Sequence, residues 1–238
     1  MTLNRPENRN ALSDVLVNEL HAHLLAANAD EAVRSIVITG TGPAFCAGAD
    51  LKNPPGRGGD RSVGMPQLLT TILESPKPVI AAINGAAFAG GLGIVGAADI
   101  VVTSESALFS FSEVRIGVIP AIISVVCVPK LGRHHAMRLF VTGERFDGRQ
   151  AVGYGLAHRA VPADALMSAV QAEIDMINLG GPIAVQECKK LVRQVMNWGV
   201  EEGFAQAEPW SKRMFQSDEA SEGLAAFREK RKPRWNQS

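Results

Sequence analysis

One acidic side chain stands inside a largely apolar stretch of the sequence. Glu113 lies within residues 110–120, where most neighbours are aliphatic, aromatic or small. An unpaired carboxylate in apolar surroundings is costly to ionise, which raises its pKa and suits it to exchange protons near neutral pH. The structural alternative is an ion pair with Arg115 or another base, because buried acids are rare unless paired. Glu113 is therefore a candidate general acid/base.

Two segments rich in glycine and alanine each follow a predicted strand. Residues 44–51 and residues 85–93 combine small side chains with a single phenylalanine each. Small side chains let a ligand approach the main chain, so that free N–H groups can point at it. One N–H from each segment would form an oxyanion hole, which stabilises negative charge on a carbonyl oxygen. Tight packing of a helix on a sheet requires a similar composition and stays the alternative.

Several familiar binding and catalytic patterns are missing. Gly40 and Gly42 follow a predicted strand, as in a dinucleotide-binding turn, but the third glycine is absent and Pro43 interrupts the turn. The sequence has no GxxxxGKS or GxxxxGKT phosphate loop, no GxSxG serine-hydrolase elbow and no HExxH zinc motif. Dinucleotide-binding proteins, P-loop enzymes, serine hydrolases and zinc proteases of these types are therefore disfavoured.

The composition predicts a cytoplasmic protein with one large domain, or a domain with a small appendage. Of 238 residues 46% are hydrophobic, and 24 Lys and Arg balance 24 Asp and Glu, which disfavours a general nucleic-acid partner. No apolar run is long enough to span a membrane, and the start lacks a signal-peptide pattern. The widely spaced Cys46, Cys127 and Cys188 favour a reducing compartment. We expect no metal and no redox cofactor.

Strands and helices alternate in the first two thirds of the chain. Apolar spacing predicts a helix over 11–27, and unbroken apolar runs predict buried strands at 35–39, 79–83 and 99–103. A Gly- and Pro-rich stretch at 53–64 predicts a mobile loop, followed by a short helix that ends before Pro76. This order predicts β-α-β units and a largely parallel sheet.

The last third of the chain has a helical pattern throughout. Helices are expected over 162–178, 182–197, 200–215 and 218–232. We therefore divide the chain into an α/β core at residues 1–161, which holds the candidate site, and a helical region at 162–238.

Five segments, taken in order, resemble the motifs of one enzyme family. They are residues 3–12, 45–51, 85–100, 143–156 and 222–231. Together they span essentially the whole chain and resemble the crotonase (enoyl-CoA hydratase/isomerase) superfamily, most closely its bacterial methylglutaconyl-CoA hydratase-like members. The resemblance implies an α/β fold of the crotonase type, a ββα superhelix with a C-terminal helical trimerisation region.

The resemblance also implies an activity and the residues for it. The reaction would be hydration or dehydration of an α,β-unsaturated acyl-CoA thioester, in fatty-acid or branched-chain amino-acid catabolism, with coenzyme A as part of the substrate. The main-chain N–H groups of Ala49 and Gly90 would hold the thioester oxygen, and Glu113 would be the acid/base. The residues implied to contact the substrate are Glu7, Asn8, Arg9, Ala47, Asp50, Leu51, Lys52 and Lys230.

Assembly is implied by the same resemblance. A homotrimer, or a hexamer made of two trimers, would place Lys230 near the 3′-phosphate of coenzyme A in a neighbouring subunit. Lys230 belongs to a basic run over 228–234 that would otherwise be only a solvated face. Leu224 and Phe227, on the apolar face of the same helix, need a partner.

Two departures from the family pattern leave alternatives open. Gly93 stands where two-glutamate hydratases carry their first glutamate, a feature that the methylglutaconyl-CoA hydratase-like branch shares. A Δ3-Δ2-enoyl-CoA isomerase, which manages with one glutamate, is therefore an alternative within the family. A non-catalytic acyl-CoA-binding subunit is the alternative from another class. The second departure is at the start, where a hairpin that normally precedes residue 3 is almost absent.

Overall fold

A parallel sheet of five strands lies at the centre of the computed structural model, which describes residues 1–50 and 63–236. Its strand order is β1-β2-β4-β6-β9. The strands are β1 (Thr2–Leu3), β2 (Ile36–Gly40), β4 (Val79–Ile83), β6 (Ile100–Ser104) and β9 (Arg159–Val161). The three buried strands predicted at 35–39, 79–83 and 99–103 are confirmed to within one residue.

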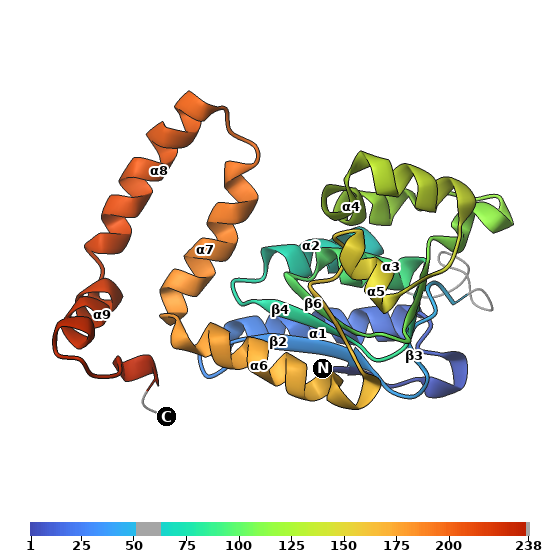
Figure 1. Cartoon of the computed structure of the whole chain (residues 1–238), viewed down its shortest axis with the longest axis horizontal. Coiled ribbons are helices and arrows are strands. Elements are labelled where there is room, and N and C mark those ends of the chain that lie inside the picture. Colours follow the sequence, from blue (N-terminus) through green and yellow to red (C-terminus); the bar gives the residue numbers. More distant parts are fainter. Residues whose placement is uncertain (51–62, 237–238) are drawn as a thin grey trace.

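Helices cover both faces of this sheet. They are α1 (Asp14–Ala29), α2 (Met65–Glu74) and α3 (Gly90–Ala97) on one side and α6 (Leu166–Leu179) on the other (Figure 1). Along β4, residues 79, 81 and 83 pack into the larger core with α1 and α2, whereas Ile80 and Ala82 pack against α6. Because both faces are buried, β4 is apolar at every position, and β2 and β6 begin with apolar runs instead of alternating with polar residues.

A second, smaller sheet was not predicted from the sequence. Its order is β3-β5-β7-β8, and its strands are β3 (Ala44–Cys46), β5 (Ala86–Phe88), β7 (Leu108–Ser110) and β8 (Phe146–Asp147). The first three run parallel and β8 is antiparallel to β7. Strands of two or three residues are too short to give a recognisable period in the sequence.

A long kinked helix, also not predicted, covers α3. Helix α4 (Ala121–Thr142) contains Pro129 and changes direction at Gly132, whose backbone is non-helical. The remaining short elements are α5 (Gly148–Gly153), η1 (Pro6–Asn8), η2 (Ser112–Ile116), η3 (Ala163–Ala165) and η4 (Arg234–Asn236). Helix α4 places Ile123 and Cys127 in the core beside α3.

The last three helices form an arm that extends away from the sheet (Figure 1). They are α7 (Pro182–Val195), α8 (Val200–Phe215) and α9 (Asp218–Arg228), and we call residues 182–228 the helical arm. The helices predicted in this region are confirmed, with ends that differ by a few residues. The domain boundary between 161 and 162 stays a prediction, although α6 packs on the sheet. No helix in the described part of the chain is long and apolar enough to cross a membrane.

Candidate active site

The second sheet brings the predicted site segments to one edge. Ala49 follows β3, Gly90 follows β5 and Glu113 follows β7. These three strands are parallel, so their carboxyl ends lie at the same edge of the sheet. Residues more than sixty positions apart in the sequence therefore converge, at the kind of sheet edge where α/β proteins commonly bind ligands.

The main chain around Ala49 leaves its N–H pointing away from the neighbouring segment. Leu12 donates its N–H to the Gly48 carbonyl at 2.7 Å, and Asp50 donates to the Leu12 carbonyl at 3.3 Å. This is an isolated parallel bridge between Leu12 and Ala49. In such a bridge the bonds come from the residues on either side, so the N–H of Ala49 faces the opposite direction.

Gly90 presents its N–H at the start of α3. The preceding Ala89 has φ 46° and ψ −122°, a left-handed backbone conformation that costs a residue other than glycine about 1–3 kcal/mol. The Ala89 N–H bonds to the Ser110 carbonyl at 3.0 Å, which helps to fix the turn. The first N–H groups of a helix have no partner within it and lie at the positive end of its dipole. The turn therefore leaves the Gly90 N–H free to donate a hydrogen bond, and the positive end of the α3 dipole favours a negatively charged acceptor there.

The two donors lie close together because Gly48 has no side chain. A Cβ atom built on Gly48 would lie 2.9 Å from the Ala89 Cβ and 3.4 Å from the Gly90 nitrogen. A Cβ built on Gly90 would lie 3.7 Å from the Ala49 nitrogen. Gly48 also has φ +95°, which favours glycine. The geometry thus brings together the pair of N–H groups that the sequence predicts.

Glu113 lies in η2 and has an unpartnered oxygen. Its Oε2 atom is buried without a hydrogen-bond partner. Burial raises the pKa of Glu113 above its usual range, against a smaller opposite effect of its own main-chain N–H. No ion pair joins Glu113 to Arg115 among the described residues, where the Oε2 atom of Glu113 has no partner and Nε of Arg115 lies 3.2 Å from a Cβ built on Gly143. The carboxylate is therefore suited to accept or donate a proton.

The space beside Gly93 is occupied by aliphatic side chains. A Cβ built on Gly93 would lie 2.7 Å from Cγ2 of Ile123 and 3.2 Å from Cδ1 of Leu69. Leu69 comes from α2 and Ile123 from α4, and both are buried. Position 93 is one helical turn after Gly90, so the same face of α3 carries the main-chain donor and this apolar contact.

The whole chain, residues 1–238, matches the family model described as enoyl-CoA hydratase/isomerase. The chain belongs to the enoyl-CoA hydratase/isomerase family. A carnitinyl-CoA dehydratase of Proteus mirabilis is 34% identical to it over 98% of this chain and 92% of that protein. A 2,3-dehydroadipyl-CoA hydratase of Escherichia coli is 30% identical over the same shares.

Solved structures agree with this assignment. The crystal structure of an enoyl-CoA hydratase of Mycobacterium smegmatis superposes with a TM-score of 0.92 at 32% identity, over 99% of this chain and 94% of that chain. The α/β fold of the crotonase type, with a helical C-terminal region, is therefore confirmed. Members of this family act on acyl-CoA substrates, and the protein is an enzyme of the crotonase family.

Against this family background, Asn10 is a site residue that the sequence did not single out. Its side chain is fully buried in a left-handed turn and accepts a hydrogen bond from the Arg5 N–H at 2.8 Å. Its amide donates to the carbonyls of Thr41 and Ala44 at 3.0 and 2.8 Å. Asn10 thus ties the first family motif to the start of β3. The signal was available, because a polar residue that tolerates a left-handed turn stands in that motif.

The predicted substrate-contact residues of the core fall into two groups. Glu7, Asn8 and Arg9 form a turn whose Arg9 carbonyl accepts a hydrogen bond from the Ala47 N–H at 3.0 Å. The nearly buried Asp50 lies beside the same turn, with the Arg5 guanidinium 3.9 Å away. Leu51, Lys52 and most of the loop predicted to be mobile at 53–64 lie outside the described residues. The roles of all these residues remain predictions.

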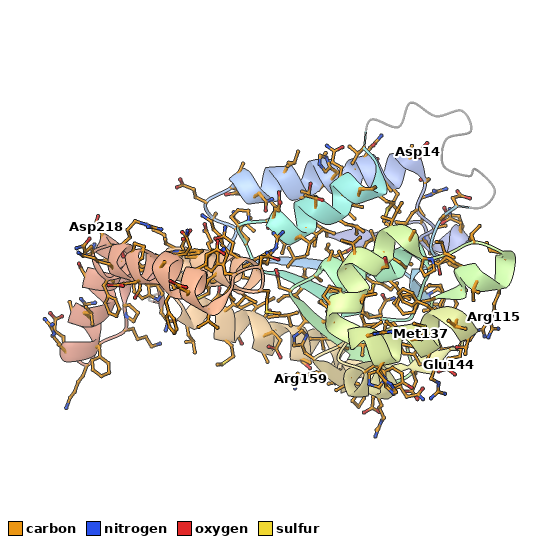
Figure 2. All side chains as sticks on the ribbon, turned by 90° about the horizontal axis from the view of Figure 1, so that it is seen from above. Asp14, Arg115, Met137, Glu144, Arg159 and Asp218 are labelled. Atoms are coloured by element: carbon orange, nitrogen blue, oxygen red, sulfur yellow. The ribbon has the colours of Figure 1, made fainter. Side chains whose placement is uncertain are left out.

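Lys230 lies far from the rest of the predicted site in the same chain. It is exposed and follows α9 in a left-handed turn with φ 55°. Helix α9 is at the end of the arm, away from β3 and α3 (Figure 1). The second view agrees, because Asp218 at the start of α9 and Arg115 in η2 lie at opposite ends of the molecule (Figure 2). A contact between Lys230 and the substrate would therefore need a neighbouring subunit.

Proposed function

We propose that the protein hydrates an α,β-unsaturated acyl-CoA thioester, or dehydrates the corresponding 3-hydroxyacyl-CoA. The observation that carries the proposal is that two free N–H groups, at Ala49 and Gly90, lie at the same sheet edge as Glu113, whose Oε2 atom is buried without a hydrogen-bond partner. The two N–H groups can donate hydrogen bonds to a thioester oxygen that gains negative charge. The Glu113 carboxylate can exchange a proton.

The reaction follows from this geometry. The two N–H groups polarise the thioester carbonyl, which makes Cβ electrophilic. Glu113 takes a proton from water as the oxygen adds to Cβ, and the electron pair of the double bond moves to the carbonyl oxygen as an enolate. The same proton then returns from Glu113 to Cα, so water is added across the double bond and no redox cofactor is consumed.

Isomerisation of a 3-enoyl-CoA is the second candidate, and one observation favours it. Leu69 and Ile123 fill the space at Gly93, so a second carboxylate to orient water is not available there. A single Glu113 suffices to move a proton between two carbons through the same enolate. The discriminating feature is whether an oxygen atom from water enters the product.

The experiment is a screen of substrates in water labelled with the heavy oxygen isotope. Crotonyl-, 3-methylglutaconyl- and 3-enoyl-CoA are each incubated with the enzyme, and the products are analysed by mass spectrometry. Hydration predicts a labelled 3-hydroxyacyl product, whereas isomerisation alone predicts an unlabelled 2-enoyl product. Tight binding of all three thioesters without turnover would contradict both, and would favour a non-catalytic acyl-CoA-binding subunit.

We also propose that the arm completes the enzyme by assembly into trimers, alone or paired as hexamers. Large apolar side chains are exposed along it: Val192, Met196, Val200, Phe204, Phe215, Leu224 and Phe227. Exposed apolar surface of this extent is typical of protein–protein contacts. A neighbouring arm would bring Lys230 toward the coenzyme A phosphate of another subunit, where an ammonium group is a suitable point charge.

A further inference from the structure

Helix α2 packs against α3, the helix that begins at the Gly90 donor. Its Leu69 is 2% exposed and meets the position of Gly93 through both of its methyl groups, at 3.2 and 3.4 Å from a built Cβ. Gly93 lies one turn from the Gly90 donor, so Leu69 packs on the part of α3 that follows the proposed oxyanion hole. A small shift of α2 would change how far this side chain reaches over α3.

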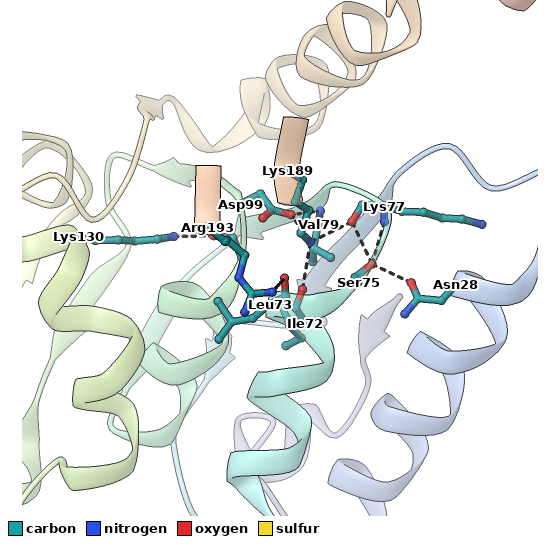
Figure 3. Close-up of polar contacts among 11 residues, drawn as sticks. Asn28, Ile72, Leu73, Ser75, Lys77, Val79, Asp99, Lys130, Lys189 and Arg193 are labelled. Atoms are coloured by element: carbon teal, nitrogen blue, oxygen red, sulfur yellow. Dashed lines mark hydrogen bonds and ion pairs between the residues drawn. The ribbon is translucent and has the colours of Figure 1, made fainter. Parts of the chain in front are cut away.

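The C-terminal end of α2 is held by the helical arm. The last carbonyls of a helix have no partner within it. Lys189 of α7 donates from Nζ to the Ile72 carbonyl at 3.1 Å, and Arg193 donates to the Leu73 carbonyl at 2.6 Å (Figure 3). Ile72 and Leu73 are three and four residues after Leu69, so these bonds act on the next turn of the same helix.

Lys189 has all three of its hydrogens bound in this cluster. Besides Ile72 it donates to the Lys77 carbonyl at 3.1 Å and pairs with Oδ2 of Asp99 at 2.7 Å. Asp99 in turn accepts the Val79 N–H at 2.7 Å, at the start of β4 (Figure 3). An ammonium group has three N–H donors, so every donor of Lys189 has an acceptor in this cluster. Its side chain is only 8% exposed, which lowers the Lys189 pKa despite the opposing effect of Asp99.

The neighbouring helix ends are held from within the core. Lys77 donates to the Ala27 carbonyl of α1 at 2.6 Å, and Lys130 donates to the Ala98 carbonyl after α3 at 2.5 Å. Both lysines belong to the part of the chain that forms the sheet and its covering helices. The end of α2 differs, because its cations come from the arm.

We propose that Lys189 is a positioning residue for acyl-group selectivity: by fixing the end of α2 it sets how closely Leu69 approaches Gly93. The inference rests on the proposed function, since it assigns the selectivity of the same site. In this proposal the position of the helical arm affects the substrate through α2. Removing the Lys189 contacts lets α2 relax outward, which gives room to an acyl group with an extra substituent at Cβ.

The test compares Lys189→Met with Lys190→Met. Lys190 is the adjacent lysine, lies over the Trp210 ring of the arm and loses the same charge without touching α2. The readout is the ratio of kcat/KM for 3-methylcrotonyl-CoA over crotonyl-CoA. We expect Lys189→Met to raise this ratio about tenfold, the lower end of what one methylene decides in an apolar pocket. Lys190→Met should leave it within about twofold of wild type.

A double mutant shows whether the effect passes through Leu69. In a Leu69→Val background, Lys189→Met should change the ratio by less than about twofold, because both changes act on the same contact. A full tenfold change in that background, or an unchanged ratio in the single mutant, overturns the proposal. If Lys189→Met does not fold, Arg193→Gln replaces it, and it must raise the ratio in the same direction.

The outcome for the proposed function is read separately. Wild-type enzyme that hydrates neither crotonyl-CoA nor 3-methylglutaconyl-CoA contradicts the proposed function. The ratio of the dissociation constants of 3-methylcrotonyl-CoA and crotonyl-CoA then still tests the positioning role of Lys189. Selectivity at Leu69 is expressed in binding as well as in turnover.

Discussion

At the scale of single residues, Glu113 combines a buried, unpartnered oxygen with a position after β7, at the same sheet edge as the two main-chain donors. Glu113→Gln keeps the size of the side chain but cannot accept a proton. We expect kcat to fall roughly 10²–10⁴-fold, the usual cost of losing a general acid/base, while the dissociation constant for an acyl-CoA stays near wild type. Initial-rate assays measure kcat, and calorimetry measures the dissociation constant.

Glu144→Gln is the matched control for this change. Glu144 pairs with Arg138 at 2.9 Å on the surface, so its loss should leave kcat essentially unchanged. Near-wild-type turnover by Glu113→Gln would contradict the assignment of the acid/base.

The raised pKa of Glu113 predicts opposite effects of pH on activity and on stability. A base must be ionised, so kcat/KM should fall on the acid side with an apparent pKa above the ordinary 4.5 of a glutamate. In the same pH window the folded state binds more protons than the unfolded state, so stability decreases as pH rises through it. Thermal melting should therefore show Glu113→Gln gaining stability relative to wild type at pH 8 but not at pH 4. An equal difference at both pH values would contradict the shift.

Sequence patterns predicted the candidate reacting groups but not the residues that hold them in place. Glu113 was identifiable because an acid in an apolar stretch is unusual, and the two glycine-rich segments because small residues expose the main chain. Asn10 was missed because a single polar residue in a loop has no period, and two of its three hydrogen bonds join positions more than thirty residues apart. Leu69 and Ile123 look like ordinary core residues until α2 and α4 are placed over Gly93.

At the scale of elements, the approach of the turns after β3 and β5 depends on Gly48. Gly48→Ala would force a Cβ to within 2.9 Å of the Ala89 Cβ at φ +95°, so the two turns must separate. We expect kcat to fall roughly 10²–10³-fold, as when one oxyanion donor is lost, with a smaller change in KM. Steady-state kinetics on the preferred thioester measures both.

The control is Gly153→Ala in α5. No atom lies within 4 Å of its built Cβ, so the substitution should be tolerated with unchanged kinetics. A Gly48→Ala enzyme with full activity would show that the two N–H groups need not lie close together.

The long elements were predictable and the short ones were not. The three core strands and the arm helices carry enough residues for their apolar spacing to be read. Strands β3, β5 and β7 are three residues long each, and their sheet is defined only by pairing between distant segments. Helix α4 was hidden by Pro129 and Gly132, which suggest a break, and the structure places a kink there.

At the scale of the whole molecule, the arm leaves apolar side chains without a partner in the chain. Phe204 is 74% exposed and Phe227 is 83% exposed. We expect a trimer or hexamer in light scattering, and a monomer would contradict the proposed assembly. In that assembly Lys230→Glu should raise KM for CoA thioesters roughly tenfold or more, the cost of a lost charged hydrogen bond, with kcat nearly unchanged.

Pantetheine thioesters provide the control for Lys230, because they lack the 3′-phosphate. Their KM should not respond to Lys230→Glu, and Arg228→Glu, a charge reversal two residues before Lys230 at the end of α9, should affect neither substrate class. Equal KM changes for both classes would show that Lys230 does not contact the phosphate.

Addition of water to a 2-enoyl-CoA by means of Glu113 can be followed through the ultraviolet absorbance of the conjugated thioester. Crotonyl-CoA is mixed with wild-type enzyme and with Glu113→Gln, and the absorbance is followed to equilibrium. We expect the absorbance to decrease with wild-type enzyme, since hydration removes the conjugated double bond, and not to decrease on the same timescale with Glu113→Gln. An unchanged absorbance with wild-type enzyme across crotonyl- and 3-methylglutaconyl-CoA, or an equal decrease with the variant, would contradict the proposed hydration by means of Glu113.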